Sequence, residues 1–419
     1  MARTLAVRHH PTVTPVDRPS AYRWVMLGLL CLGYGSFGLV SASLAPLLGP
    51  ILRDTGMTRG EIGFVLGSWQ FVYLFVAIPA GALVDRVGLR RALFAGIALV
   101  ALSQALRAFA FDQWTMLAAV MVFGLGGPFI SVGAPKLTAT WFSREEAGLA
   151  LGIYTVSPSV GSILATSTAN SLLMPATGES WRATLLIYAV IAAAAAIAWL
   201  LLAREHASAS NRAGAGISTT RAFGTLLRVP VVQLVLLMAV GCFLVNHSLT
   251  NWLPEMLRAG GMTPSGAGFW ASVPTLVAVV AALLVPRFAH DRILTTVQLA
   301  VFTTWGAGLA LLWFGGDAAL PAGLVLTGIG RGAGTPLLML TLLRSPRVGP
   351  ALMGAAGGLF FTAGEVGGVL GPTLTGVLAD ATGGYGVTLV ALAATCGALA
   401  LLALPLGAAA RATRDAATR

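Results

Sequence analysis

The chain has 419 residues, of which 57% are hydrophobic and only 10% are charged, and its mean hydropathy is +0.84. Soluble globular domains carry about 25% charged residues, so this composition excludes a water-soluble globular protein and predicts an integral membrane protein in a lipid bilayer. The formal net charge of +11 does not indicate nucleic-acid binding, because the basic residues are scattered through short loops, as topology signals are. We therefore expect no nucleic-acid partner.

Twelve apolar stretches follow one another along the chain, each long enough to cross a bilayer as a helix of about 20 residues. Residues 1–22, before the first stretch, are polar and proline-containing, which predicts a disordered cytoplasmic tail rather than a cleavable signal peptide. The long polar connection 204–228 separates the sixth stretch from the seventh and is rich in Ser and Gly. The stretches cover residues 24–52, 61–84, 91–111, 115–140, 147–174, 182–203, 229–256, 265–288, 294–315, 319–343, 350–379 and 384–408.

The two sides of the polar connection carry the same sequence pattern, about 205 residues apart, as expected of fused structural halves. Residues 52–58 (LRDTGMT) return as residues 257–263 (LRAGGMT). Five glycines of the first half, Gly63, Gly124, Gly126, Gly152 and Gly161, return as Gly268, Gly328, Gly330, Gly358 and Gly367. The sequence thus predicts an all-α membrane protein with twelve transmembrane helices in two six-helix pseudo-symmetric halves. The expected domains are a tail 1–22, a bundle 23–203, a cytoplasmic linker 204–228, a bundle 229–409 and a cytoplasmic tail 410–419.

The distribution of basic residues predicts the orientation in the membrane. If the N-terminus is inside, most of the 26 Arg and Lys residues fall on inner segments, and cytoplasmic loops carry such an excess. We therefore expect both termini in the cytoplasm and a multi-pass protein of the plasma (cell inner) membrane.

The loop after the second stretch reads Gly81-Ala-Leu-Val-Asp85-Arg86-Val-Gly88-Leu-Arg90-Arg91. This resembles the signature of the major facilitator superfamily, and the twelve stretches, the central loop and the repeat extend the resemblance over nearly the whole chain. The resemblance implies a secondary transporter that works by alternating access, with this loop as an inner gate.

The residues of this motif suggest their own roles. We expect Gly81 to allow close helix approach, Gly88 to permit a tight turn, and Asp85 to form ion pairs with the basic cluster of Arg86, Arg90 and Arg91. Alternatively, the arginines only set the topology. The second-half copy keeps Asp291-Arg292 but has Leu294 in place of Gly88, so we expect less of it.

Within the superfamily, residues 252–257, 285–287 and 141–152 resemble the cyanate and nitroimidazole porter branch. Gly152, Pro158 and Gly161 match the antiporter motif of drug-exporting members only in part, and a Gly/Pro-kinked packing helix is an equal alternative. The fourth stretch lacks the Arg that many members carry before its glycines, which counts against a typical proton-coupled drug exporter.

Two ionisable residues fall deep inside apolar stretches, where charge is costly and marks a functional site by default. Arg331 lies in the tenth stretch among four glycines, and Glu365 lies in the eleventh. A guanidinium offers a fork that fits carboxylate and other planar anions. We expect Arg331 to bind substrate and Glu365 to couple a proton, with a permanent Arg331–Glu365 salt bridge as the structural alternative.

Four polar or aromatic residues near the expected midplane are further candidates for substrate binding, although each also fits a packing role: Tyr34, Gln70, Tyr154 and Asn246. His247, the one intramembrane His, could titrate near neutral pH, but a core role is the alternative. Arg107 and Lys136 lie near stretch ends, where snorkelling to the interface would suffice.

The sequence predicts alternating-access secondary transport of a small solute, a small organic or inorganic anion, with or without proton coupling, by a monomer. The alternative is export of apolar drug-like compounds by proton antiport. The apolar stretches contain no pair of His residues and no His/Cys cluster of the kind that would indicate an enzyme or a metal site. We expect no catalytic residue, no metal and no cofactor.

Overall fold

The computed structural model describes residues 21–205 and 219–418. The tail predicted before Tyr22 and the middle of the 204–228 connection lie outside these residues. The first half comprises α1 (Tyr22–Ala42), η1 (Ala45–Leu47), α2 (Leu48–Thr55), α3 (Arg59–Val87), α4 (Leu89–Ala108), α5 (Gln113–Trp141), α6 (Arg144–Thr168), η2 (Ala169–Leu173), α7 (Met174–Ala176) and α8 (Trp181–Leu202). After a short α9 (Thr219–Leu226), the second half comprises α10 (Pro230–Ala259), α11 (Pro264–Phe288), α12 (Leu294–Phe314), α13 (Gly316–Leu343), α14 (Gly349–Thr382) and α15 (Gly386–Thr418).

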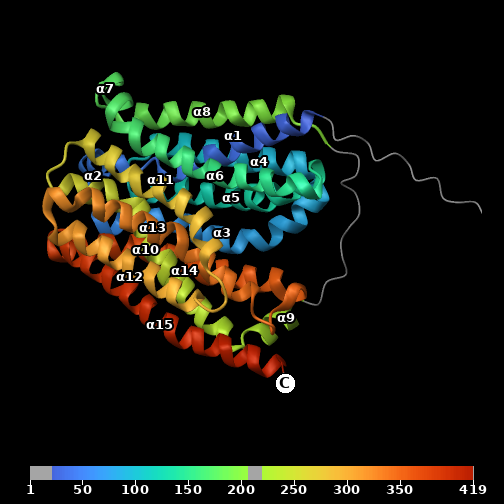
Figure 1. The fold of residues 1–419 in the computed structure, drawn as a ribbon. Coiled ribbons are helices and arrows are strands. Elements are labelled where there is room, and N and C mark those ends of the chain that lie inside the picture. Colours follow the sequence, from blue (N-terminus) through green and yellow to red (C-terminus); the bar gives the residue numbers. More distant parts are fainter. Residues whose placement is uncertain (1–20, 206–218, 419) are drawn as a thin grey trace, which may run out of the picture.

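The two halves lie one against the other with their helices running in roughly one direction (Figure 1). The described residues provide 12 helical segments that are long and apolar enough to cross a membrane. The start of α1 and the end of α15 lie at the same end of the molecule, here called the tail end, and α2 and α7 lie at the opposite, distal end. The prediction of an all-α protein with twelve spans in two six-helix halves is confirmed.

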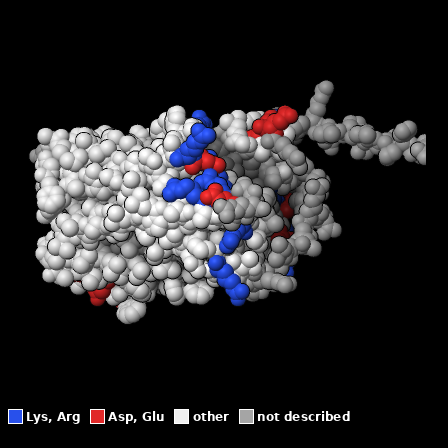
Figure 2. Space-filling model, turned by 60° about the horizontal axis from the view of Figure 1, so that its bottom comes forward, with Lys and Arg blue, Asp and Glu red and all other residues white. Residues whose placement is uncertain are grey.

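Charged side chains are unevenly distributed on the surface. On the face in Figure 2, Lys, Arg, Asp and Glu gather mainly in a band towards the tail end, and most of the remaining surface carries no charge. Large apolar residues such as Leu201, Phe314 and Leu401 are more than two thirds exposed. An uncharged, apolar exterior is what a bilayer requires of helices that span it.

The repeated glycines occupy equivalent packing positions in the two halves. A β-carbon at Gly161 of α6 would collide with the carbonyl of Gly35 in α1, and one at Gly367 of α14 would collide with the carbonyl of Val240 in α10. Gly124 likewise approaches the α3 backbone, and Gly328 approaches the α11 backbone. Small residues let membrane helices approach closely, so the repeat in the sequence preserves the same helix contacts in both halves.

One repeated pair of glycines joins the two halves rather than the helices within each. Gly63 of α3 lies against the carbonyl of Pro372 in α14, and its counterpart Gly268 of α11 lies against the carbonyl of Thr166 in α6. Both contacts are in the distal half of the molecule. They form two symmetry-related seams, α3–α14 and α6–α11, which hold the halves together there.

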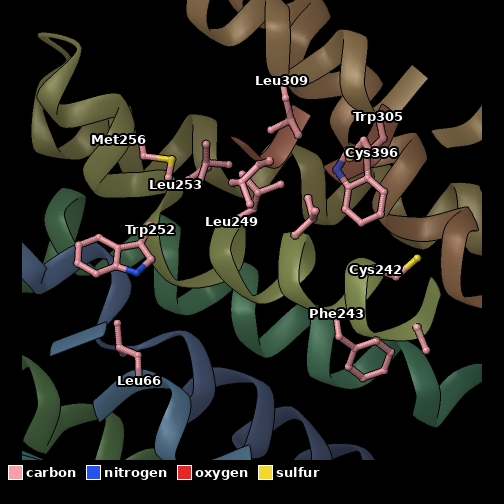
Figure 3. Close-up of a cluster of buried hydrophobic side chains, with 14 of the residues drawn as sticks. Leu66, Cys242, Phe243, Leu249, Trp252, Leu253, Met256, Trp305, Leu309 and Cys396 are labelled. Atoms are coloured by element: carbon pink, nitrogen blue, oxygen red, sulfur yellow. The ribbon is translucent and has the colours of Figure 1, made fainter. Parts of the chain in front are cut away.

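The core beside the α3–α14 seam is built on α10. Trp252, which is fully buried, lies near Leu66 of α3 (Figure 3) and donates from its indole Nε1 to the carbonyl of Pro372, at 3.0 Å. On the other side of α10, Cys242 lies near Trp305 and Cys396 (Figure 3). The cysteines are free, as their positions in apolar stretches suggested. This core fixes α10 between the seam and the rest of its half.

Two helical boundaries differ from the prediction. The first span is broken between Ala42 and Ala45 rather than continuous. Helix α15 runs through residues 410–418, where a polar tail was predicted, because this segment is rich in alanine, the strongest helix former, and Arg414 pairs with Asp291 at 3.2 Å. The linker also contains the helix α9.

The substitution Gly63→Ala should open the α3–α14 seam, because a β-carbon there would stand 2.5 Å from the carbonyl oxygen of Pro372. Spin labels on the exposed residues Arg53 and Ala381, at the distal ends of the two halves, should then report longer distances in electron paramagnetic resonance. The control Gly81→Ala lies in the same helix and meets no atom within 4 Å. Identical distance distributions for both variants would contradict the seam.

Candidate functional site

Arg331 lies near the middle of α13 and reaches α10. Its Nε donates to Asn246 Oδ1 at 2.8 Å, and its Nη2 donates to Thr250 Oγ1 at 2.8 Å. Asn246 and Thr250 are four residues apart, so they share one face of α10. Two neutral oxygens therefore hold the guanidinium in a fixed orientation near the middle of the protein.

No carboxylate neutralises this guanidinium. The ion pairs that the structure describes leave out Arg331, so the alternative of a permanent salt bridge to Glu365 is not realised in this conformation. Nη1 makes no hydrogen bond to a described residue, yet it is not among the buried atoms that lack a partner. The third nitrogen of the fork is thus accessible and available to a ligand.

Glu365 lies near the middle of α14 and is 9% exposed. Its Oε2 is buried without a hydrogen-bond partner, whereas Oε1, also without one, is not sealed. A β-carbon on Gly368, one turn along, would lie 2.8 Å from Glu365 Oε2, 3.2 Å from Gln70 Cγ and 3.4 Å from His247 Cδ2. The carboxyl group therefore borders side chains of both halves.

Gln70 of α3 and His247 of α10 connect the two halves directly. Gln70 Nε2 and His247 Nδ1 are 3.0 Å apart, and Gln70 is fully buried. The other end of the amide, Gln70 Oε1, is buried without a partner. His247 in turn lies within electrostatic range of Arg331, so Glu365, Gln70, His247 and Arg331 form one polar cluster across the interface.

The first half presents mainly aromatic rings beside this cluster. The Trp69 ring lies 5.9 Å from the His247 ring and 5.9 Å from the Phe37 ring, measured between centroids. Phe37 continues to Tyr34, whose ring lies 5.9 Å from the ring of Tyr154. Trp69, Phe37 and Tyr34 remain partly exposed, and rings from the first half meet the polar groups of the second where Trp69 contacts His247.

The structure brings together four of the predicted site residues and sets two apart. Arg331 and Asn246 are hydrogen-bonded, and Gln70 and Glu365 lie in the same cluster. Tyr34 and Tyr154 contact each other within the first half and are connected to the cluster only through the rings of Phe37 and Trp69.

Sequence reasoning missed Thr250 and Tyr73 as members of the site. Tyr73 donates to or accepts from Ser131, with the oxygens 2.6 Å apart, and lies within electrostatic range of Glu365. Helical spacing could have found both residues, since Thr250 follows Asn246 by four positions and Tyr73 follows Gln70 by three.

The motif after α3 differs in part from the prediction. Gly88 has a positive φ of 89° between α3 and α4, so the expected tight turn is confirmed. Gly81, by contrast, meets no neighbouring atom within 4 Å, so the predicted close approach is wrong here. Asp85 pairs with Lys136 of α5 rather than with the basic cluster. Arg90 donates to the carbonyl of Leu200, while Arg86 and Arg91 form no ion pair with a described residue.

The second-half copy of the motif retains an ion pair despite its missing glycine. Asp291 accepts from Arg344 of α13 at 2.9 Å and from Arg414 of α15 at 3.2 Å. Each motif aspartate therefore joins the helical ends of its own half. The expectation that the second copy contributes less stays a prediction. None of these ion pairs at the tail end joins one half to the other.

The halves are linked instead at the distal end. Asp380 of α14 accepts from the backbone N–H groups of Arg59 and Gly60 at the start of α3, at 3.3 and 2.7 Å, and its carboxylate lies 3.6 Å from the Arg59 guanidinium. A carboxylate at a helix N-terminus is stabilising. Towards the tail end of the same helices, Gly81 and Gly354 meet no atom within 4 Å, so neither makes a close contact with the other half.

Arg107 was expected to snorkel from a helix end, and that expectation is wrong. Arg107 is only 2% exposed, and its Nη1 donates to the carbonyl of Val40 at 2.7 Å. The break in the first span after Ala42 leaves carbonyl groups that need donors. Arg107 therefore completes the end of α1.

The fold agrees with comparisons to known proteins. The sequence profile of the Major Facilitator Superfamily matches residues 30–372, and the chain belongs to this family. A bacterial homolog of the human lysosomal transporter Spinster, solved in an inward-facing and unoccupied conformation, has the same fold, with a TM-score of 0.75. It is 16% identical and the alignment covers 94% of this chain and 98% of that one.

Three relatives are transporters with named substrates. The 2-nitroimidazole transporter of Escherichia coli (strain K12) is 26% identical over 370 residues, covering 87% of this chain and 90% of that protein. The nitrite extrusion protein of Bacillus subtilis (strain 168) is 23% identical over 378 residues, covering 88% and 90%. The D-galactonate transporter of Escherichia coli O6:H1 (strain CFT073) is 23% identical over 441 residues, covering 92% and 96%. The chain is therefore a multi-pass membrane transporter.

The substitution Asp380→Ala should make the distal end open more often, because it removes both the ion pair and the acceptor for Gly60. A cysteine at Ala267, which is 2% exposed in α11, should react about two- to fivefold faster with a maleimide, as loss of up to about 1 kcal/mol implies. The control Asp54→Asn breaks the distal pair with Arg182, which lies within one half. An equal labelling rate in the two variants would argue against a distal latch.

Proposed function

We propose that the protein is a secondary transporter of a small anion that binds at Arg331 between the two halves. The observation that carries this proposal is the guanidinium itself, which is held near mid-helix by neutral oxygens and has an accessible Nη1 and no carboxylate partner. A charge in such a place is costly unless it is paired. An anionic substrate would supply the missing partner for part of the transport cycle.

The chemistry of the relatives' substrates supports recognition of one kind of oxygen-bearing group. Nitrite, the nitro group of 2-nitroimidazole and the carboxylate of D-galactonate all contain two terminal oxygens on one planar centre. A guanidinium fork donates two parallel hydrogen bonds to such a group. We infer that this chain recognises a planar O–X–O group, with X carbon or nitrogen.

The contacts between the halves support transport by alternating access. The distal end is held by the two glycine seams and by Asp380, and the described ion pairs at the tail end stay within one half. If the tail end is cytoplasmic, as the distribution of basic residues predicts, this conformation is inward-facing. Rocking of the halves about the site would then expose Arg331 to the opposite side.

Glu365 is the group proposed to carry a coupled proton. Its buried Oε2 lacks a partner, and its Oε1 makes no hydrogen bond to a described residue, so the carboxyl can take up a proton without breaking a hydrogen bond. Burial favours the neutral form of a carboxyl. Since Glu365 does not pair with Arg331 here, the proton and the anion have separate places in one site.

The substitutions Arg331→Lys and Arg331→Ala should both reduce anion uptake into proteoliposomes by about 30-fold or more, because truncating one partner of a buried charge pair costs 2–5 kcal/mol and Lys lacks the fork. The control Arg287→Ala removes an exposed arginine of α11 in the same half and should transport normally. Near-normal uptake by Arg331→Ala would end the anion proposal.

The substitution Glu365→Gln should abolish uptake driven by a pH gradient and leave anion exchange intact, because the amide cannot release a proton. Radiolabelled counterflow measures exchange, and uptake after an imposed pH jump measures the drive. The control Glu145→Gln changes an exposed carboxyl at the start of α6. If gradient-driven uptake survives in Glu365→Gln, another group couples the proton.

The aromatic rings of the first half favour a second candidate function, which is export of apolar drug-like compounds by proton antiport. Tyr34, Phe37, Trp69 and Tyr154 form linked rings on the first half. An apolar solute would stack on these rings and leave Arg331 as a structural residue. Drug resistance that persists in Arg331→Ala cells, without anion uptake by the wild type, would favour export.

A further inference from the structure

The cluster at the interface contains two buried oxygens that both lack a hydrogen-bond donor. Gln70 Oε1 and Glu365 Oε2 are each sealed from solvent without a partner, and both side chains border Gly368. A buried acceptor without a donor is unfavourable. A proton on Glu365 would turn its oxygen into a donor, and Gln70 Oε1 is the unsatisfied acceptor on a neighbouring side chain.

Gln70 is also the link between this carboxyl and His247. Its Nε2 end lies 3.0 Å from His247 Nδ1, so in this orientation the amide donates and Nδ1 accepts. A neutral imidazole with Nδ1 as acceptor carries its proton on Nε2. The orientation seen here is therefore the one that a protonated Glu365 would complete.

Turning the Gln70 amide over satisfies the opposite protonation state. The two ends of an amide are nearly equal in shape, so Nε2 can donate to an ionised Glu365 while Oε1 accepts from His247. The imidazole must then carry its proton on Nδ1, which leaves Nε2 as a bare acceptor. Each protonation state of the carboxyl thus selects one amide orientation and one imidazole tautomer.

The second ring nitrogen of His247 is free, and the ring lies within electrostatic range of the proposed anion site. His247 Nε2 has no hydrogen bond to a described residue and is not among the sealed atoms. His247 follows Asn246, which binds Arg331, and lies within electrostatic range of that guanidinium. A donor at Nε2 would attract an anion bound there, whereas a lone pair would repel it.

We propose that Glu365, Gln70 and His247 form a relay that converts protonation of a carboxyl in one half into a donor at the anion site, through an amide of the other half. The relay itself does not require the proposed function. Only its consequence, that the proton and the anion bind cooperatively, rests on that function. No bond other than the carboxyl O–H and the imidazole N–H changes, and the imidazole exchanges its proton between its own nitrogens through water. Among the described residues, the other titratable or charged groups near the carboxyl or the imidazole are Tyr73 of α3 and Arg331 of α13.

The relay can be tested without any substrate, by nitrogen-15 NMR of histidine-labelled protein in detergent from about pH 5 to about pH 9. Signals of His247 are assigned by their loss in His247→Asn. In the wild type, the neutral ring should change from the Nε2–H to the Nδ1–H tautomer as the pH rises. Gln70→Met, which keeps the volume, and Glu365→Gln, which holds a donor at position 365, should each abolish the change.

The control Tyr73→Phe removes the neighbouring hydroxyl, which bonds to Ser131 outside the relay, and should retain the switch. A single tautomer across the range in the wild type, or a persistent switch in Gln70→Met, would overturn the relay. If Gln70→Met does not fold, a pH-dependent tautomer in Glu365→Gln overturns it equally. These outcomes leave anion binding at Arg331 untouched, because uptake by the Arg331 variants tests that separately.

Discussion

The placement of one guanidinium near the middle of a membrane-spanning helix is the constraint on which the site depends. Asn246 and Thr250 satisfy two of its donors but supply no negative charge. Hydrogen bonds to neutral oxygens orient an arginine, whereas only an anion offsets the cost of its charge in a poorly solvated place. The chain provides the anion neither through Glu365 nor through another described carboxylate, which is why we assign that role to the substrate.

The glycine repeat explains how such a site can be exposed to each side of the membrane in turn. Within each half, equivalent glycines bring the same pairs of helices into backbone contact, so each half is held as a unit. Gly63 and Gly268 instead make the contacts between halves, and both lie towards the distal end. Rigid halves favour rocking over deformation, and the polar cluster lies beside the α3–α14 seam, where Gly67 approaches the backbone of Val369.

The sequence was sufficient to predict the class of fold and the two deepest charges. The lengths of the apolar stretches predicted twelve spans, and the constant offset between equivalent glycines predicted two similar halves. Both properties can be read from the order of residues alone. The partners of Arg331 and Asp85 could not be predicted, since they depend on which faces of neighbouring helices meet. The break after Ala42 was missed although Pro46 stands four residues further on and cannot continue the helix. The buried Arg107 that completes the break lies in another helix and could not be predicted.

The most direct test of the account is the thermal stability of the purified protein in the presence of planar O–X–O anions, with nitrite, benzoate and D-galactonate as probes and chloride as the reference, at two pH values. A ligand at 100 times its dissociation constant stabilises a protein by about 2.7 kcal/mol. The account predicts that at least one of these anions raises the Tm of the wild type, that chloride does not, and that Arg331→Ala loses the increase. An equal increase in Arg331→Ala, or none with any probe at either pH, would contradict it.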